Sequence, residues 1–262
     1  MRNGLSPFLK VVVGVVALLL VAPTLIVIPM SFSSGTTFRF PPRGWSLRWY
    51  EELLTDPAWL DSISRSLLIG FIVMVVAGVC GTLVALGLHY GKFRGSGLIE
   101  SLVLAPMVAP TIVLAVSVYI SFLYWNLTGT LLGYVLAHAM LAIPFVYVSV
   151  NTSLKSLDPI LGNAAASLGS TPMRTFRRVT FPLVLPGVLA GMVFAFVTSF
   201  DEVVVSLFIR SPGTETLPVR MFNSVTLQID PTISAAASVV VVLVTAVILT
   251  AQLVFVQRKQ TK

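Results

Sequence analysis

The chain has 262 residues, of which 56% are hydrophobic and only 10% are charged, and its mean hydropathy is +0.95. Soluble globular domains carry about 25% charged residues, so this composition excludes an ordinary soluble protein and indicates an integral membrane protein. The formal net charge of +7 gives no reason to expect a nucleic-acid partner, because the uneven placement of the basic residues along the chain accounts for it.

Six apolar runs are long enough to cross a bilayer, which takes about 20 helical residues. They predict an all-α membrane protein with six transmembrane helices. The runs cover Val11–Met30, Leu67–Leu88, Leu102–Leu123, Leu131–Val150, Leu183–Ile209 and Ile233–Val256. The first run follows Arg2 and Lys10, as the core of a signal peptide would. It is longer than the usual core of about 7–15 residues and no clear cleavage site follows it, so we expect a retained span.

The basic residues predict the orientation of these spans. With six spans both termini lie on one side of the membrane, and eleven of the 17 lysines and arginines fall on that side. The arginines on the other side are largely offset by acidic residues. Basic residues concentrate on the cytoplasmic side of membrane proteins, so both termini are expected to be cytoplasmic.

The sequence offers little for cofactor or metal chemistry. Cys80 is the only cysteine, and His89 and His138 are isolated, so neither an intrachain disulfide nor a metal site is expected. The phosphate-binding pattern G-x-x-x-x-G-K-[ST] does not occur. We therefore expect this chain to bind no cofactor, and any ATPase that drives it must be a different chain.

The segment from Ser31 to Ser62 is the longest predicted outer loop. Its pattern indicates an extended proline-rich stretch, a short helix from Ser46 and a second helical start at Asp56-Pro57. Its aromatic residues are typical of a membrane-interface belt, and they are Trp45, Trp49, Tyr50 and Trp59. Two interpretations stay open, namely a helix lying on the membrane surface and a docking surface for an external partner.

Small residues and prolines within the runs predict how the spans pack and bend. Ala77, Gly81 and Ala85 recur every fourth residue, which lets helices approach closely in lipid. Prolines inside the third and fourth runs remove backbone donors and are expected to bend those helices. These prolines are Pro106, Pro110 and Pro144.

The stretch "SLDPILGNAAASLGSTPMRTFRRVTFP", Ser156 to Pro182, contains two helix starts between two spans. Asp158-Pro159 combines an N-cap with a proline at the first helical position, and Gly169 is a natural stop. Thr171-Pro172 repeats the start, and Pro182 precedes the fifth run. The sequence predicts a helix, a sharp turn, a second short helix and then the membrane.

The surface of this stretch favours a docking element. Ala164, Ala165 and Ala166 give the first helix a face with little side chain, which can press closely into a groove. Arginines 174, 177 and 178 can pair with carboxylates or lipid phosphates. An ordinary cytoplasmic loop would explain the arginines but not the two proline-capped helices and the alanine face.

The same stretch resembles the EAA loop of ABC importer permeases, in which E-A-A is followed by three residues, G, nine residues and I-x-L-P. Here the pattern reads Asn163-Ala164-Ala165, then Gly169, then Val179–Pro182. Asn163 replaces the usual glutamate, and two consequences stay open, namely a weaker charged contact to the ATPase or a neutral hydrogen bond in its place. The stretches "FPPRGWSLRWYEELLTDPAWLDS", "SFDEVVVSLF" and "TLPVRMFNS" are similar to permeases of polyamine-type importers.

The resemblance implies the type I ABC importer permease fold. Residues 1–262 would form one transmembrane domain of the bacterial inner membrane, with residues 153–182 as a cytoplasmic coupling loop between helices 4 and 5. It also implies a second permease of a different sequence, two ATP-binding subunits that use ATP and Mg, and a periplasmic binding protein. The ATPase-coupling residues would be Asn163, Ala164, Ala165, Gly169, Thr171, Pro172, Arg174, Arg177 and Pro182.

An acidic pair, Asp201 and Glu202, interrupts the fifth run. Eighteen residues from Leu183 rise about 27 Å, so the pair is expected near the outer mouth of the membrane. Carboxylates at that depth usually face a cavity or a partner. One interpretation is a cation-attracting substrate path, with Phe200 as a gate or stacking surface and with Thr198 and Ser206 completing a polar strip on the same helix. The other is a structural ion pair with Arg65, Arg210 or an arginine of a partner.

These observations indicate a non-enzymatic permease subunit of an ATP-driven importer for a small cationic or amino compound, with a polyamine such as putrescine or spermidine favoured. The alternative substrates are an opine, an amino acid derivative or an aminophosphonate. A stand-alone secondary transporter or channel is the rival from another class, and dependence on a separate ATPase discriminates the two.

Overall fold

The computed structural model describes residues 6–91, 94–228 and 230–260, and most of them are helical. The longest non-helical segment is residues 32–47. Within these ranges no β-strand forms, apart from a single bridge between Ser33 and Trp45. The chain divides into two compact units, which are described separately. Met1–Leu60 and Met221–Lys262 form the first unit, and Asp61–Arg220 forms the second.

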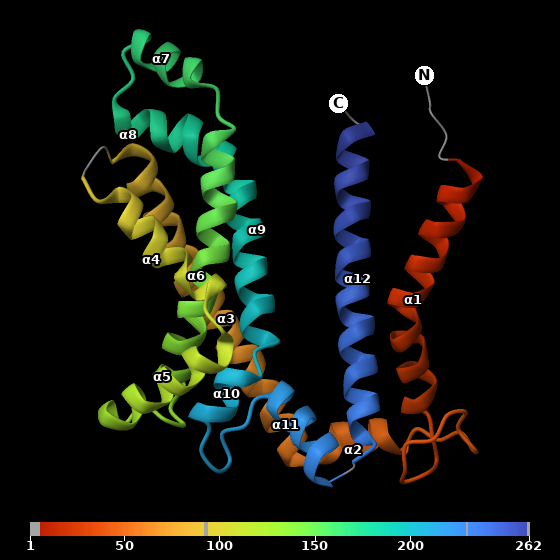
Figure 1. Ribbon diagram of the computed structural model, residues 1–262. Helices are drawn as coiled ribbons and strands as arrows, with labels where there is room; N and C mark the ends of the chain where they lie inside the picture. Colours follow the sequence, from red (N-terminus) through yellow and green to blue (C-terminus); the bar gives the residue numbers. More distant parts are fainter. Residues whose placement is uncertain (1–5, 92–93, 229, 261–262) are drawn as a thin grey trace. The chain divides into compact units, whose positions relative to one another are not determined.

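The first unit is built on two long helices, α1 (Pro7–Ser31) and α12 (Thr232–Gln260), which pack against each other (Figure 1). Ser6 caps α1 by accepting a hydrogen bond from the Leu9 amide at 3.3 Å. The short helix α2 (Arg48–Thr55) packs on α12, and a π-helical turn, η2 (Ser224–Gln228), precedes α12.

The predicted elements of the long loop are present. α2 begins near the expected Ser46, and Asp56 caps α3 (Pro57–Tyr90), where its Oδ1 accepts from the Ala58 amide at 2.8 Å. The aromatic belt is only partly correct. Trp45 is 70% exposed, but Trp49 and Trp59 are 7% and 0% exposed. Two of the indoles therefore belong to the packed interior.

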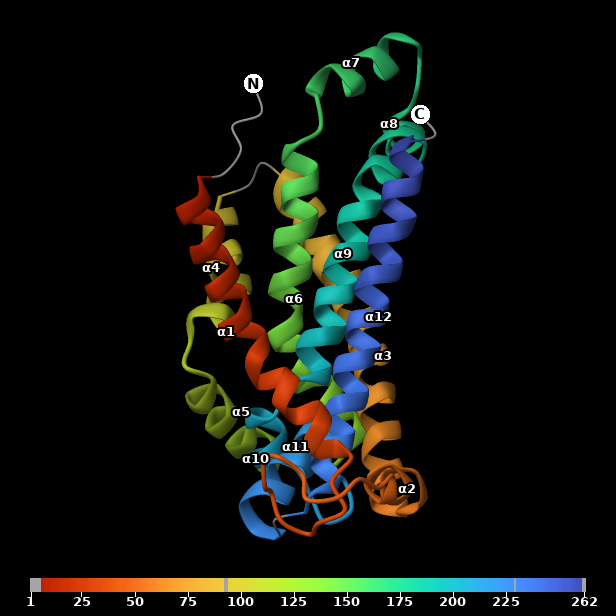
Figure 2. The ribbon, with the colours of Figure 1, turned by 90° about the vertical axis from the view of Figure 1, so that its right-hand side faces the viewer.

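The second unit has α3, α6 (Leu131–Lys155) and α9 (Phe181–Phe200) at its centre. The α6 and α9 helices run side by side in both views (Figure 1, Figure 2). The predicted small-residue face of α3 is confirmed, because Ala77 and Ala85 are fully buried. A β-carbon on Gly81 would lie 2.7 Å from Val146 Cβ, so only glycine permits this approach of α3 to α6.

The third apolar run does not form one straight helix. It divides into α4 (Ser96–Val108) and α5 (Thr111–Trp125), which meet at an angle of 106°. Ala109 is extended with ψ 140°, as expected for a residue before proline, and Pro110 starts the new helix. The predicted bend thus lies at Pro110, whereas Pro106 and Pro144 sit inside continuous helices.

The connection from α6 to α9 begins with α7 (Pro159–Ser167), as predicted. The prediction of a separate second helix before the membrane is wrong. α8 (Pro172–Thr175), the π-helical turn η1 (Phe176–Thr180) and α9 follow without a break, giving one helix of 29 residues from Pro172 to Phe200. In η1 the Phe181 amide bonds to the Phe176 carbonyl, and this wider turn lets the helix continue through Pro182.

After α9 the chain forms two short helices, α10 (Val204–Ile209) and α11 (Leu217–Asn223). α10 packs on α5 and α6. Among the described residues, four helices are long and apolar enough to cross a membrane, and the bent pair α4–α5 would be a fifth span. The described side chains of α12, Thr232–Ala246, form a shorter apolar helix.

The glycines of α9 provide a test of this packing. A β-carbon on Gly191 would lie 2.9 Å from the Val146 Cα, whereas one on Gly87 of α3 would have nothing within 4 Å. We expect Gly191→Val to force α9 away from α6 and to cost about 1–3 kcal/mol. The midpoint of thermal unfolding in detergent should then fall by several degrees, and the matched variant Gly87→Val should stay close to wild type. Equal midpoints for the two variants would contradict this packing.

Candidate functional site

The helix α7 has the caps that its sequence predicts. Asp158 Oδ1 accepts a hydrogen bond from the Ile160 amide at 2.9 Å, and Pro159 occupies the first turn. At the other end Gly169 has a φ of +74°, and the amide of Ser170 bonds to the Ala165 carbonyl at 3.0 Å. This is the left-handed closure for which glycine is preferred. Thr171 then caps the next helix by accepting from the Arg174 amide at 3.4 Å.

The outer surface of α7 is apolar and open. Ala164 and Ala166 are exposed and Ala165 is half-buried, while Ile160 and Leu168 are 67% and 88% exposed. An exposed cluster of this kind marks a surface that contacts another protein or the membrane.

The polar residues around α7 are also available to a partner. Arg174, Arg177 and Arg178 are exposed, and within the described residues none of them forms an ion pair. Thr171, Pro172 and Pro182 are exposed as well. The side chain of Asn163, the first residue of the EAA-like pattern, lies outside the part of the chain that the structure describes.

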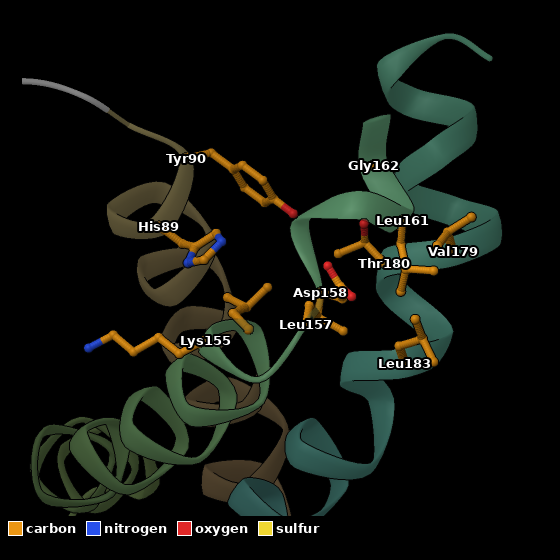
Figure 3. Close-up of a pocket in the computed structure, with 11 residues that line it drawn as sticks. His89, Tyr90, Lys155, Leu157, Asp158, Leu161, Gly162, Val179, Thr180 and Leu183 are labelled. Carbon is orange, nitrogen blue, oxygen red and sulfur yellow. The ribbon is translucent and has the colours of Figure 1, made fainter. Parts of the chain in front are cut away.

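A cavity of about 440 Å³ separates α7 from the ends of the long helices (Figure 3). Its walls come from the end of α3, the end of α6, α7 and η1. Tyr90 and Asp158 point toward the interior of the cavity, whereas the ammonium group of Lys155 points away from Asp158. Besides bordering this cavity, α7 packs against α8 and η1.

The predicted acidic pair lies at a corner between two helices. α9 ends at Phe200 and α10 begins at Val204, so Asp201 and Glu202 are in the short step that joins them. Asp201 is exposed, and within the described residues its side chain has no hydrogen bond or ion pair. Glu202 is half-buried, and its Oε1 accepts from the Val205 amide at 2.7 Å, so this carboxylate caps α10.

The predicted polar strip is wrong. Thr198 lies in α9 and Ser206 in α10, and the non-helical step between them removes the common face that a continuous helix would give. Ser206 is fully buried and therefore does not line an open path. The capping hydrogen bond of Glu202 starts a new helix where the sequence contains no glycine or proline.

The arginines that were candidates for a structural ion pair have other partners. Arg210 forms an ion pair with Glu215, and Arg65 Nη2 donates to the Gly213 carbonyl at 3.1 Å. Neither arginine neutralises the acidic pair in this structure. Phe200 is half-buried and stacks on Phe196, with ring centroids 5.7 Å apart and planes 19° apart.

One residue of this corner was missed at the sequence level. His138 of α6 lies between Ser199 and Ser206, with each of its ring nitrogens 2.9 Å from one serine hydroxyl. Ser199 and Ser206 lie 61 and 68 positions after His138 in the sequence, so no local pattern links them to it. The signal that the sequence did offer was a lone histidine within the apolar run Leu131–Val150.

The two candidate regions lie at opposite ends of the α6–α9 pair (Figure 1). α7 and its arginines occupy one end, and the acidic corner occupies the other. Among the described residues, no group of three His, Cys, Asp or Glu side chains is arranged to hold a metal ion.

Comparison with known proteins identifies close relatives over most of the chain. The chain is 33% identical to the putrescine transport system permease protein PotI of Escherichia coli K12 over 242 residues, which is 90% of this chain and 86% of PotI. It is 32% identical to the spermidine/putrescine transport system permease protein PotC of the same strain over 243 residues, covering 92% of this chain and 90% of PotC.

The fold has counterparts among solved structures. A chain of the bacterial alginate ABC transporter, crystallised in complex with an alginate pentasaccharide-bound periplasmic protein, matches with a TM-score of 0.72 and 15% identity, covering 92% of this chain and 90% of that one. The profile of the binding-protein-dependent transport system inner membrane component family matches residues 77–261. The chain belongs to this family, the permease subunits of ABC importers, which are membrane components without enzymatic activity of their own.

Proposed function

We propose that this chain forms half of the translocation pathway of an ATP-driven importer for a polyamine such as putrescine or spermidine. The identity to PotI and PotC over about nine tenths of the chain carries this proposal. The acidic corner supports it independently, because Asp201 is exposed and has no ion pair among the described residues, which suits a substrate with several ammonium groups.

The proposed membrane topology has six spans and both termini in the cytoplasm. α1, α3, α6 and the helix Pro172–Phe200 each have the length and hydropathy of a span. The bent pair α4–α5 would be the third span and α12 the sixth. Both compact units would then work as one permease domain of the bacterial inner membrane, and the excess of lysine and arginine in the predicted cytoplasmic segments supports this orientation.

The proposed partners follow from the two ends of the α6–α9 pair. Residues 153–182 would be the coupling loop, and the open apolar surface of α7 would seat in a groove of one of two ATPase subunits that use ATP and Mg. A second permease, of a different sequence, would supply the other half of the pathway. A periplasmic binding protein would deliver the substrate at the acidic end.

The continuous helix Pro172–Phe200 suggests how the two ends communicate. Its 29 residues span about 43 Å, so it runs from the coupling loop to the acidic corner. Because α7 packs against α8 and η1, which form the first part of this helix, a push by the ATPases on α7 would tilt the helix as a unit. The step at Asp201–Val203 would move with it and alternate between outward and inward access.

The proposed function is tested by transport in a purified system. Proteoliposomes that contain this chain, its second permease, the ATPase and the binding protein should take up radiolabelled putrescine or spermidine only when ATP is present. If neither amine is transported while ATP hydrolysis persists, the substrate assignment is wrong. Uptake by this chain alone would contradict an importer and indicate a secondary transporter or channel.

Gly169 offers a test of the coupling loop. Its φ of +74° is strained for a β-branched residue, whereas asparagine tolerates this conformation. We expect Gly169→Val to change the direction of α7 and to abolish ATP-driven uptake while the assembled ATPase still hydrolyses ATP. Gly169→Asn should retain most uptake. Undiminished transport by Gly169→Val would rule out a coupling role for this turn.

The acidic corner is tested by removing charge without removing hydrogen bonds. Asp201→Asn should lower the initial rate of amine uptake about tenfold or more, because the substrate ammonium group loses its attraction to the carboxylate. A tenfold decrease corresponds to about 1.4 kcal/mol of lost interaction. Glu202→Gln keeps an oxygen that can accept from the Val205 amide, so we expect a smaller decrease. Asp201→Glu is the charge-conserving control. Uptake unchanged in both Asp201→Asn and Glu202→Gln would show that these carboxylates are not in the path.

A further inference from the structure

The step between α9 and α10 needs a physical cause. Asp201, Glu202 and Val203 include neither glycine nor proline, and the residues on both sides are helical. The capping bond from the Val205 amide to Glu202 helps to start α10, but it does not fix the direction in which α10 leaves α9.

His138 joins the two sides of this step. Its Nδ1 lies 2.9 Å from the Ser199 hydroxyl in the last turn of α9, and its Nε2 lies 2.9 Å from the Ser206 hydroxyl in α10. All three side chains are buried, with exposed fractions of 1%, 5% and 0%. One ring on α6 therefore holds both helices.

These two hydrogen bonds are incompatible with an unbroken helix. Ser199 and Ser206 are seven residues apart, which in a continuous α-helix places them about 10.5 Å apart along the axis. A single imidazole with one 2.9 Å hydrogen bond on each side spans less than that distance. Satisfying both buried hydroxyls with one histidine thus requires the chain to break and turn between them.

Neighbouring contacts extend the same arrangement. Tyr134 lies one turn before His138, and the two rings pack edge to face with their centroids 5.9 Å apart. The Tyr134 hydroxyl donates to the Thr214 carbonyl at 2.7 Å. The Gly129 amide donates to the Ile209 carbonyl at 2.7 Å, at the end of α10. The first half of α6 and the turn before it therefore hold α10 from its beginning to the segment beyond it.

We infer that His138 is a positioning residue that fixes the direction in which α10 leaves α9, so that Asp201 is exposed and Glu202 caps α10. A neutral imidazole has one donor and one acceptor nitrogen, so it matches two serine hydroxyls without leaving a buried polar atom unpaired. Only the effect of His138 on transport rests on the proposed function, because its effect on the corner is independent of the substrate.

The corner can be probed directly with a cysteine at its centre. In a Cys80→Ser background, Val203→Cys places one thiol in the step, where Val203 is half-buried. The rate of labelling by a membrane-impermeant maleimide is then measured in the assembled importer. His138→Leu removes both hydrogen bonds at similar volume, and we expect the labelling rate to rise about tenfold as the step loosens. His138→Gln, whose amide has one donor group and one acceptor, should keep a rate near that of wild type.

Single serine variants guard against a misfolded His138→Leu protein. Ser199→Ala and Ser206→Ala each remove one hydrogen bond and should give intermediate labelling rates. Ser117→Ala is the control for the loss of a serine hydroxyl away from the corner, because among the described residues the Ser117 hydroxyl bonds only to the Val113 carbonyl of its own helix. Labelling rates that stay at the wild-type value in His138→Leu and in both serine variants would overturn the inference.

Amine uptake by the same variants separates this inference from the proposed function. Uptake that falls about tenfold in His138→Leu, and returns in His138→Gln, would support a positioning role in transport. Faster labelling with unchanged uptake would leave His138 as the residue that holds the corner and would instead contradict the place of that corner in the substrate path.

Discussion

The close approach of α6 to α9 is the contact on which the rest of the second unit depends. Gly187 and Gly191 lack the side chains that would collide with α6, and the Ser149 hydroxyl donates to the Gly187 carbonyl at 2.8 Å across the interface. Lipid offers no hydrophobic force between helices, so this contact relies on van der Waals packing and on such hydrogen bonds. It keeps two long helices aligned, with the proposed coupling loop at one end and the acidic corner at the other.

This alignment gives each end a different physical character. At the α7 end, the exposed alanines and arginines and the cavity behind them suit a surface that is gripped and moved by another protein. At the other end, the His138 hydrogen bonds and the Glu202 cap define one local geometry around Asp201. A helix that moves at the α7 end and has a fixed local geometry at the other end can pass a movement of α7 on to the acidic corner and so change the exposure of that corner.

Local signals in the sequence predicted much of this architecture. Asp158-Pro159, Gly169 and Thr171-Pro172 have the capping geometry that their residue types indicate, because a cap depends on neighbours within four residues. The interruption by Pro110 was predictable for the same reason, but its angle of 106° was not. Long-range contacts were not predictable. The burial of Ser206 and the role of His138 depend on residues more than sixty positions apart, and the continuity of Pro172–Phe200 depends on a π-helical turn that no residue type specifies.

The central claim is that movement at the coupling loop reaches the acidic corner through the helix Pro172–Phe200. The most direct measurement is the labelling rate of the single cysteine in Cys80→Ser/Val203→Cys, compared between the ATP-free importer and the importer trapped with ATP and its binding protein. We expect rates that differ severalfold between the two states, and the same variant without the ATPase should show no response to ATP. Identical rates in both states of a transport-competent preparation would contradict the account.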